Sequence, residues 1–306
     1  MTVLFGIFLL SMLVIVAIGI VRAENLFTAV MLTGIFSLLM ASNFFILDAA
    51  DVALTEAAVG AGISTVLLLG GLTLVPGRER RHRHRLHTMA LAVAGLITAL
   101  LIYASFQQPP LGDPAAPVHT HVAPWYLEQT PLLIDIPNVV TAVLGSYRGY
   151  DTLGEVIVVL TAGIGVLFLL GLPGRIGDRR ASDVQQGKQY LSHHLIPQVA
   201  GTLLIPFILL FALYVQFHGE YGPGGGFQAG AIFAAAMILY SLIAGEREAL
   251  QVIKPKVLMV MMGGGALLYG GVGIVTMLLG GNFLDYNVLA SDPVAGQQWG
   301  ILIIEL

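Results

Sequence analysis

The sequence predicts an all-α polytopic membrane protein, a helix bundle with eight or nine transmembrane spans and its N-terminus outside. The chain is 57% hydrophobic and only 10% charged, and its mean hydropathy is +0.86. Soluble globular chains carry about 25% charged residues. The composition therefore excludes a soluble enzyme and a disordered chain. A formal net charge of -4 argues against nucleic-acid binding, and the absence of cysteine excludes disulfides and thiolate-bound metal or iron–sulfur sites.

Eight segments are apolar over the roughly 20 residues that a helix needs to cross a bilayer. In chain order, they cover residues 2–21, 26–47, 51–75, 88–106, 151–172, 195–217, 227–244 and 257–279. The first has no basic flank or cleavage site and is predicted to be an uncleaved helix. A ninth begins near Trp299 but reaches only Leu306. That is too short to span, so we expect either an incomplete sequence or a partner that completes the helix.

The lysines and arginines predict the orientation of the spans. Thirteen of the fourteen fall in four loops that share one side of the predicted bundle. Cytoplasmic loops carry such an excess, so this side is predicted to be cytoplasmic. Arg148 alone lies on the outer side. The predicted organisation is a first module of five spans at 1–172, a cytoplasmic linker at 173–194, and a second module at 195–306 with three spans and an incomplete fourth.

The third span contains a carboxylate, Glu56, about five residues or ~7 Å from its start. An ionisable group inside a span indicates function by default. The following glycines weaken the helix and favour a bulge or a rotation. They are Gly60, Gly62, Gly70 and Gly71. The alternative is tight helix packing, with Glu56 near the lipid headgroups.

A second group of charges opens the fifth span. If the helix begins by Arg148, then Arg148, Asp151 and Glu155 share one face at spacings of three and seven residues. Arginine stays protonated and can keep a carboxylate ionised, while a buried glutamate can exchange a proton near neutral pH. The sequence therefore favours an ion path here over a structural ion pair at the membrane edge.

The segment HGEYGPGGGF joins the sixth and seventh spans on the outer side. No Gly-Lys-Ser/Thr follows its glycines, which argues against nucleotide binding. Gly224, Gly225 and Gly226 indicate a tight turn packed against other helices. His218 and Glu220 could form a polar relay, or the segment could only cap two helices; the sequence leaves both open.

Two further segments are expected to have structural or lipid-contacting roles. The outer loop at 107–137 contains His119 and His121, which alone do not indicate a metal site. We expect this loop to be an external lid or a packing element. The basic run RERRHRHRLH is predicted to contact anionic lipid headgroups.

Three of these stretches resemble a known family. DVALTEAAVGAG (51–62) and YRGYDTLGE (147–155) look like the C-terminal part of the large A subunit of Mrp-type sodium/proton antiporters, and HGEYGPGGGF looks like their B subunit. The chain thus resembles a fusion of the two, over nearly its whole length. By this resemblance, Glu56, Arg148 and Glu155 match positions that serve ion passage. Asp151 and the glycine turn also match the motifs, either in the path or as structure.

The resemblance implies a non-enzymatic component of a hetero-oligomeric antiporter in a bacterial or archaeal cell (inner) membrane. Its partners would be the other antiporter subunits, Na⁺, H⁺ and lipids, with no cofactor, metal or nucleic acid. The tail module also resembles a complex I subunit whose central helix is flexible. Two alternatives remain: a membrane-arm subunit of a redox-driven pump such as a membrane-bound hydrogenase, and a scaffold that conducts nothing.

Overall fold

The computed structural model describes the whole chain except residues 1, 73–74, 76, 79–83, 111 and 171–194. Within the described part, eight helical segments are long and apolar enough to cross a membrane, as the sequence predicts. They are α1 (Thr2–Arg22), α2 (Leu26–Ile46), the composite third span, α5 (His84–Ser105), α8 (Gly149–Leu170), α9 (Leu195–His218), α10 (Gly226–Ala244) and α12 (Pro255–Leu278). The predicted linker at 173–194 lies outside the described residues, as does the centre of the basic run.

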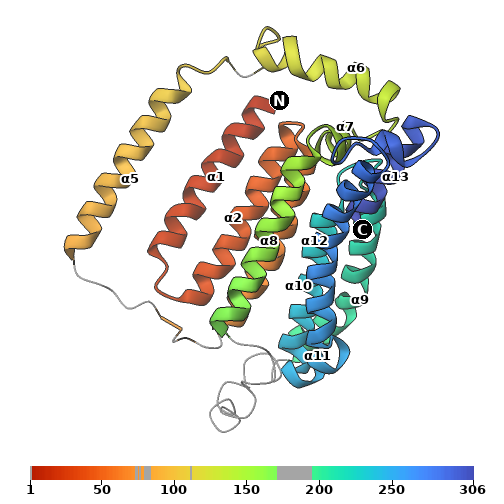
Figure 1. The fold of residues 1–306 in the computed structure, drawn as a ribbon. Coiled ribbons are helices and arrows are strands. Elements are labelled where there is room, and N and C mark those ends of the chain that lie inside the picture. The colour runs from red at the N-terminus through yellow and green to blue at the C-terminus, as the bar shows by residue number, and fades with distance from the viewer. Residues whose placement is uncertain (1, 73–74, 76, 79–83, 111, 171–194) are drawn as a thin grey trace.

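The long helices run up and down between two ends of the molecule (Figure 1). The N-terminus, α6 (Ala123–Leu133), α7 (Val139–Ala142) and α13 (Pro293–Glu305) lie at one end. The turn between α1 and α2 lies at the other end, with α11 (Glu246–Val252). This places Arg22 and Arg247 at one end and Arg148 at the other. The same separation is expected if the end that carries Arg22 and Arg247 is cytoplasmic.

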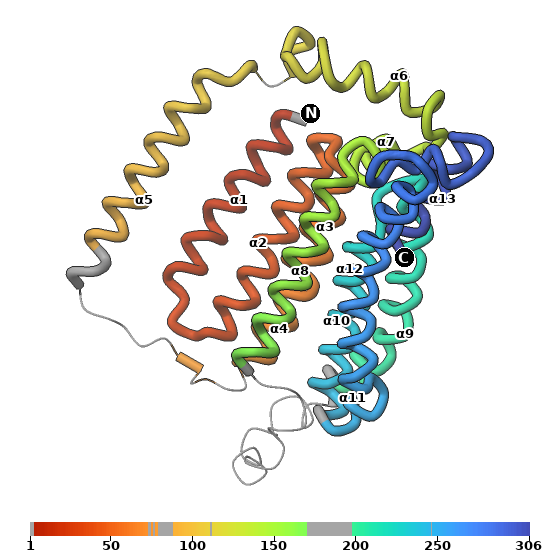
Figure 2. The backbone as a smooth tube through the Cα atoms, in the orientation of Figure 1, coloured from red at the N-terminus to blue at the C-terminus, as the bar shows by residue number. Residues whose placement is uncertain are grey.

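The third span is not one regular α-helix. It consists of α3 (Ala50–Glu56), a π-helical segment η1 (Ala57–Ser64) and α4 (Thr65–Leu72), which follow one another along one path (Figure 2). The irregular segment contains Gly60 and Gly62, where the sequence favours a bulge. The third span packs between α2 of the first module and α10 of the second, so it joins the two modules.

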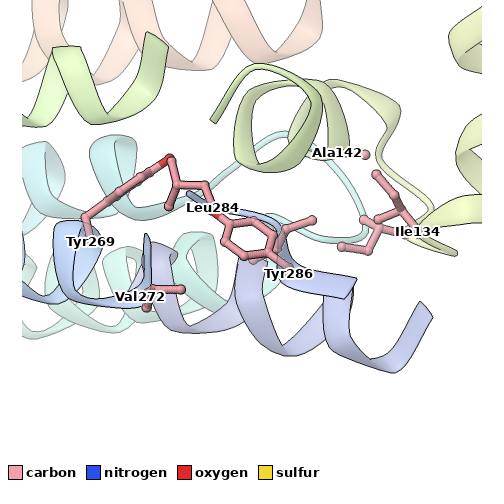
Figure 3. Close-up of a cluster of buried hydrophobic side chains, with 8 residues drawn as sticks. Ile134, Ala142, Tyr269, Val272, Leu284 and Tyr286 are labelled. Carbon is pink, nitrogen blue, oxygen red and sulfur yellow. The ribbon is translucent and has the colours of Figure 1, made fainter. Parts of the chain in front are cut away.

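A buried cluster at the end that carries α7 and α13 also joins the modules (Figure 3). It combines Ile134, Ile136 and Ala142 of the first module with Tyr269, Val272, Leu284, Tyr286 and Ile301 of the second. A smaller cluster packs Ala58 of η1 against α9 and α10 through Ala212, Val215, Ala229 and Ile232. The larger cluster holds the fifth span, through Leu153 and Val156, against the second module, and the smaller cluster holds the third span there.

The fourth span behaves differently from the others. α5 stands apart from the remaining long helices in Figure 1, and every side chain from Thr88 to Ser105 is exposed. Such an apolar helix is expected to contact lipid or another chain in its working environment. Its described side chains contribute nothing to the two buried clusters.

Two segments are more helical than their description as a loop or a short fragment suggests. The predicted loop at 107–137 is partly helical, with a π-helical turn η2 (Val118–Val122) that contains His119 and His121 and leads into α6. The last helix begins at Pro293 and not near Trp299. The Asp292 side chain caps it by accepting from the Val294 amide at 3.3 Å, and Pro293 takes the first helical position, where its missing N–H costs nothing.

Candidate functional site

A cavity of about 1400 Å³ lies between the two modules. Its walls come from α3, α8, α9, α10, α12 and α13, and most of its lining is apolar. Three carboxylates line it, one from each of three different helices: Asp51, Glu155 and Glu305. Thr55, Thr152, Gln216 and Gln228 add uncharged polar groups. The cavity therefore combines an apolar wall with a few convergent polar groups, which is typical of a binding site or a passage.

Of the charged residues predicted to line the ion path, Glu155 is the one that faces this cavity. It lies one turn beyond Thr152, whose hydroxyl donates to the Leu144 carbonyl at 2.8 Å. That bond ties the first turn of α8 to η3 (Val143–Tyr147). Glu155 makes no hydrogen bond or ion pair within the part of the chain that the structure describes, so its carboxylate is available to a cation or a proton.

Arg148 and Asp151 pair with each other at the start of α8. Arg148 precedes α8 at the end of η3, and its Nε donates to Asp151 Oδ2 at 2.6 Å. A terminal guanidinium nitrogen contacts the same oxygen. The two side chains are 63% and 55% exposed, and exposed pairs of this kind contribute little to stability. Neither residue lines the cavity, and the pair lies at the start of α8.

Glu56 faces α2, its neighbouring helix within the first module. It immediately precedes η1 and is absent from the cavity lining. A Cβ added at Gly60 would lie 2.6 Å from Glu56 Oε1 and 2.8 Å from Ser37 Cβ of α2. Glu56 therefore points along the seam between α2 and the third span. The structure does not bring Glu56 and Glu155 together.

Glycines at the turn between α9 and α10 allow close packing of backbone. A Cβ at Gly226 would lie 2.6 Å from the carbonyl oxygen of Glu305, and one at Gly224 would lie 2.5 Å from that of Val215. Gly225 has a φ of 121°, which a side chain disfavours. Gln216 Nε2 donates to the Glu305 carbonyl at 2.7 Å. The turn therefore brings the end of α13 to the edge of the cavity.

His218 and Glu220 do not form a pair. His218 stacks on Tyr214 with ring centroids 4.8 Å apart. Among the described residues, no hydrogen bond or ion pair joins His218 to Glu220. Burial raises the pKa of the Glu220 carboxyl above its usual range. The residues that the structure describes contain no group of three or more potential metal ligands, and His119 and His121 are both exposed.

The raised pKa of Glu220 predicts a small pH effect on stability. Because folding favours the protonated form, the native complex loses stability as the pH rises above the ordinary glutamate pKa of about 4.3. Glu220→Gln is expected to raise the melting temperature of the purified complex slightly at pH 7.5, because solvent screens a half-exposed group. The difference should shrink as the pH approaches 4. An equal gain at both pH values would contradict this explanation.

Sequence reasoning missed Asn138, which is buried at 9% exposure. Its side-chain oxygen caps α7 by accepting from the amides of Val140 at 3.0 Å and Thr141 at 3.4 Å. Its Nδ2 donates to Asp51 Oδ1 at 3.2 Å and to the carbonyls of Gly219 at 3.2 Å and Gly222 at 2.8 Å. The signal was an asparagine directly after Pro137 and before an apolar run, which is typical of a helix N-cap.

Three family profiles match consecutive parts of the chain. Residues 11–77 match MbhD and residues 80–175 match MbhE, which are described as the D and E subunits of MBH. Residues 196–305 match the "Domain related to MnhB subunit of Na+/H+ antiporter". The third span therefore falls within the first profile, α8 within the second, and the glycine turn within the third.

A helical chain with eight candidate spans belongs to the class of polytopic membrane proteins. It is 40% identical over 100 residues to the "Putative antiporter subunit mnhB2" of Staphylococcus aureus (strain Newman), covering 31% of this chain and 69% of that protein. The chain belongs to the family of Mrp-type antiporter subunits, and it is related to the B subunit through its second module.

Two longer relatives match both modules. A probable K(+)/H(+) antiporter A/B subunit of Rhizobium meliloti (strain 1021) is 27% identical over 88% of this chain and 29% of its own length. A chain in the structure of the Mrp complex from Dietzia sp. DQ12-45-1b superposes with a TM-score of 0.70 at 25% identity, over 97% of this chain and 33% of that one. This chain thus spans about a third of each of these two relatives.

Proposed function

We propose that this chain is an ion-translocating membrane subunit of a multi-subunit Mrp-type Na⁺/H⁺ antiporter. The observation that carries the proposal is the position of Glu155, a carboxylate without a hydrogen-bonding partner among the described residues, at the wall of the cavity between the modules. A transporter needs no covalent chemistry, so the chain acts as part of a path and not as a catalytic enzyme. The bacterial or archaeal cell membrane is its proposed location.

The lining of the cavity suits a hard cation or a proton. Sodium prefers oxygen ligands, and carboxylates together with side-chain and backbone carbonyls supply them. Asp51, Glu155 and Glu305 provide carboxylates, while Gln216 and Gln228 carry amide oxygens. In this proposal, Glu155 exchanges its proton or contacts the cation as the cavity fills.

The other predicted residues take separate places in the proposed path. Arg148 and Asp151 form a charged pair at the outer mouth, where the arginine side chain donates to the carboxylate. Glu56 lies beside the π-helical segment of the third span, where a change of helix register would move it relative to α2. Of these three predicted positions, Glu155 alone lines the cavity.

Glu155→Gln tests this proposal in the complete complex. Gln keeps the size and the hydrogen-bonding oxygen but cannot carry a proton or a negative charge. We expect cation/proton exchange in everted vesicles to fall about tenfold, the loss that ~1.4 kcal/mol represents, at an unchanged amount of complex. Glu248→Gln in the short helix α11, where the side chain is exposed, serves as the control. Normal exchange by assembled Glu155→Gln complex would reject the ion-path role.

The two profiles designated MBH favour a second candidate, a membrane-arm subunit of a redox-driven pump such as a membrane-bound hydrogenase. The same cavity would then serve an ion path driven by partner subunits. Purification of the complex from native membranes in mild detergent separates the candidates. We expect other antiporter subunits to co-purify; cysteine-rich redox subunits would instead support the second candidate.

The remaining alternative is a scaffold that conducts nothing. Neutralising Glu155 in such a scaffold would reduce assembly of the complex, and not exchange alone.

A further inference from the structure

The two carboxylates of the third span face different neighbours. Glu56 points toward α2, whereas Asp51 lines the cavity between the modules. Thr55 lines the cavity as well, because it lies one turn after Asp51 on the same helix face. The third span thus presents Asp51, and not Glu56, to the space that Glu155 faces.

Asn138 holds Asp51 in this position. The Nδ2 group has two hydrogens, and three oxygens lie within hydrogen-bonding distance: Asp51 Oδ1 and the carbonyls of Gly219 and Gly222. The opposite side of the same amide is committed to the cap of α7. With both ends of a buried side chain in use, its orientation is set, and so is the side from which it meets Asp51.

Asn138 and its neighbour Thr141 also join the first module to the glycine turn. The backbone N–H of Asn138 donates to the Glu220 carbonyl at 2.9 Å, and Thr141 Oγ1 donates to the Gly219 carbonyl at 2.7 Å. One turn along α3, Gln228 Nε2 of α10 donates to Thr55 Oγ1 at 2.8 Å. The α3 segment is thus attached to the second module directly at Thr55 and, through Asn138, at Asp51, immediately before the π-helical segment begins.

We propose that Asn138 is a positioning residue that fixes the Asp51 carboxylate at the cavity wall by tying it to the glycine turn, and that Asp51 is a further cation-contacting residue of the path. The inference rests on the proposed function. Asn138 itself does not contact the cation. It makes the placement of Asp51 depend on the turn at Gly219–Gly222, so a movement of the second module would reach the third span through this amide.

The test uses Asn138→Ser in the complete complex. Serine is an equally good N-cap, so it preserves the start of α7 while it removes the Nδ2 donor. Asn25→Ser is the matched control, because Asn25 caps α2 in the same way, through its side-chain oxygen and the amides of Phe27 and Thr28, at the opposite end of the bundle. Exchange is measured in everted vesicles against the concentration of Na⁺, and separately K⁺, per amount of complex.

We expect Asn138→Ser to raise the half-saturating cation concentration about fivefold, the size of effect that one misplaced charged contact gives. The maximum rate should change less, and Asn25→Ser should match wild type. Asp51→Asn should raise the half-saturating concentration at least as much. In the Asp51→Asn background, Asn138→Ser should add nothing, since its effect passes through that carboxylate. A fivefold effect that persists there, or an unchanged half-saturating concentration in assembled Asn138→Ser complex, would overturn the proposal.

Asp51→Asn alone decides the matter if Asn138→Ser fails to assemble, because asparagine keeps an acceptor oxygen for the Asn138 amide. Normal half-saturation in that variant overturns the role of Asp51. Glu155→Gln in the same vesicles separates the two proposals. Loss of exchange in Glu155→Gln with normal Asp51→Asn rejects only this inference. Normal Glu155→Gln with shifted Asp51→Asn rejects the role of Glu155 and retains the cation-contacting role of Asp51.

Discussion

Replacing Gly60 by alanine is expected to separate the third span from α2 and to remove most of the assembled complex. The added Cβ would lie 2.8 Å from Ser37 Cβ, and that atom is fixed by the backbone of α2. It would also meet Glu56 Oε1 at 2.6 Å, but a long side chain can move away. Overpacking of this kind costs ~1–3 kcal/mol, which exceeds the helix propensity of about 1 kcal/mol gained by losing a glycine.

The measurement for Gly60→Ala is the yield and melting temperature of the purified complex. The net cost is then at most ~2 kcal/mol, which corresponds to a fall of up to roughly 4–8 °C for a domain of about 150–250 residues. Gly62→Ala is the control in the same segment, because a Cβ there would be 3.5 Å from its nearest neighbour outside the local backbone, an ordinary contact. Ser37→Gly should restore Gly60→Ala by removing the atom it meets. Absence of any rescue would show that the α2 seam is not the cause.

Gly300→Ala is expected to disrupt the cluster that joins the modules at the end carrying α7 and α13. Gly300 packs against Tyr286, whose side chain is fully buried among Ile134, Leu284 and Ile301. A Cβ at Gly300 would lie 2.6 Å from Cδ1 and 2.7 Å from Cβ of Tyr286. A ring enclosed on all sides cannot turn away, so the backbone of α13 must shift, at a cost of about 3 kcal/mol or more.

We expect Gly300→Ala to leave little complex after detergent extraction, and the remainder to melt at a lower temperature. Gly270→Ala is the control, since Gly270 adjoins Tyr269 of the same cluster and, beyond the local backbone of its own helix, no described atom lies within 4 Å of an added Cβ there. Equal losses in both variants would attribute the effect to glycine replacement in general. Wild-type behaviour of Gly300→Ala would mean that α13 packs less tightly against Tyr286 than the structure shows.

The candidate site was predictable only in part. Glu56, Arg148 and Glu155 are evident in the sequence because charges inside or beside apolar segments are rare. Their neighbours are not evident. Glu155 faces the cavity, Arg148 binds Asp151, and Glu56 faces α2. The sequence placed all three charges of the motif on one face only if the helix begins by Arg148; α8 begins one residue later, at Gly149, and Arg148 reaches Asp151 from just before the helix.

The sequence by itself determined the fold class, the eight spans and the irregular helical segment in the third span. These depend on residues close together in the chain: apolar runs of sufficient length, and glycines that leave a helix unsupported. Only the tertiary structure decided which polar groups meet. Asn138 bonds with Asp51 and with Gly222 across 87 and 84 positions of sequence. Contacts over such separations depend on how whole helices pack, and no local pattern of residues encodes that packing.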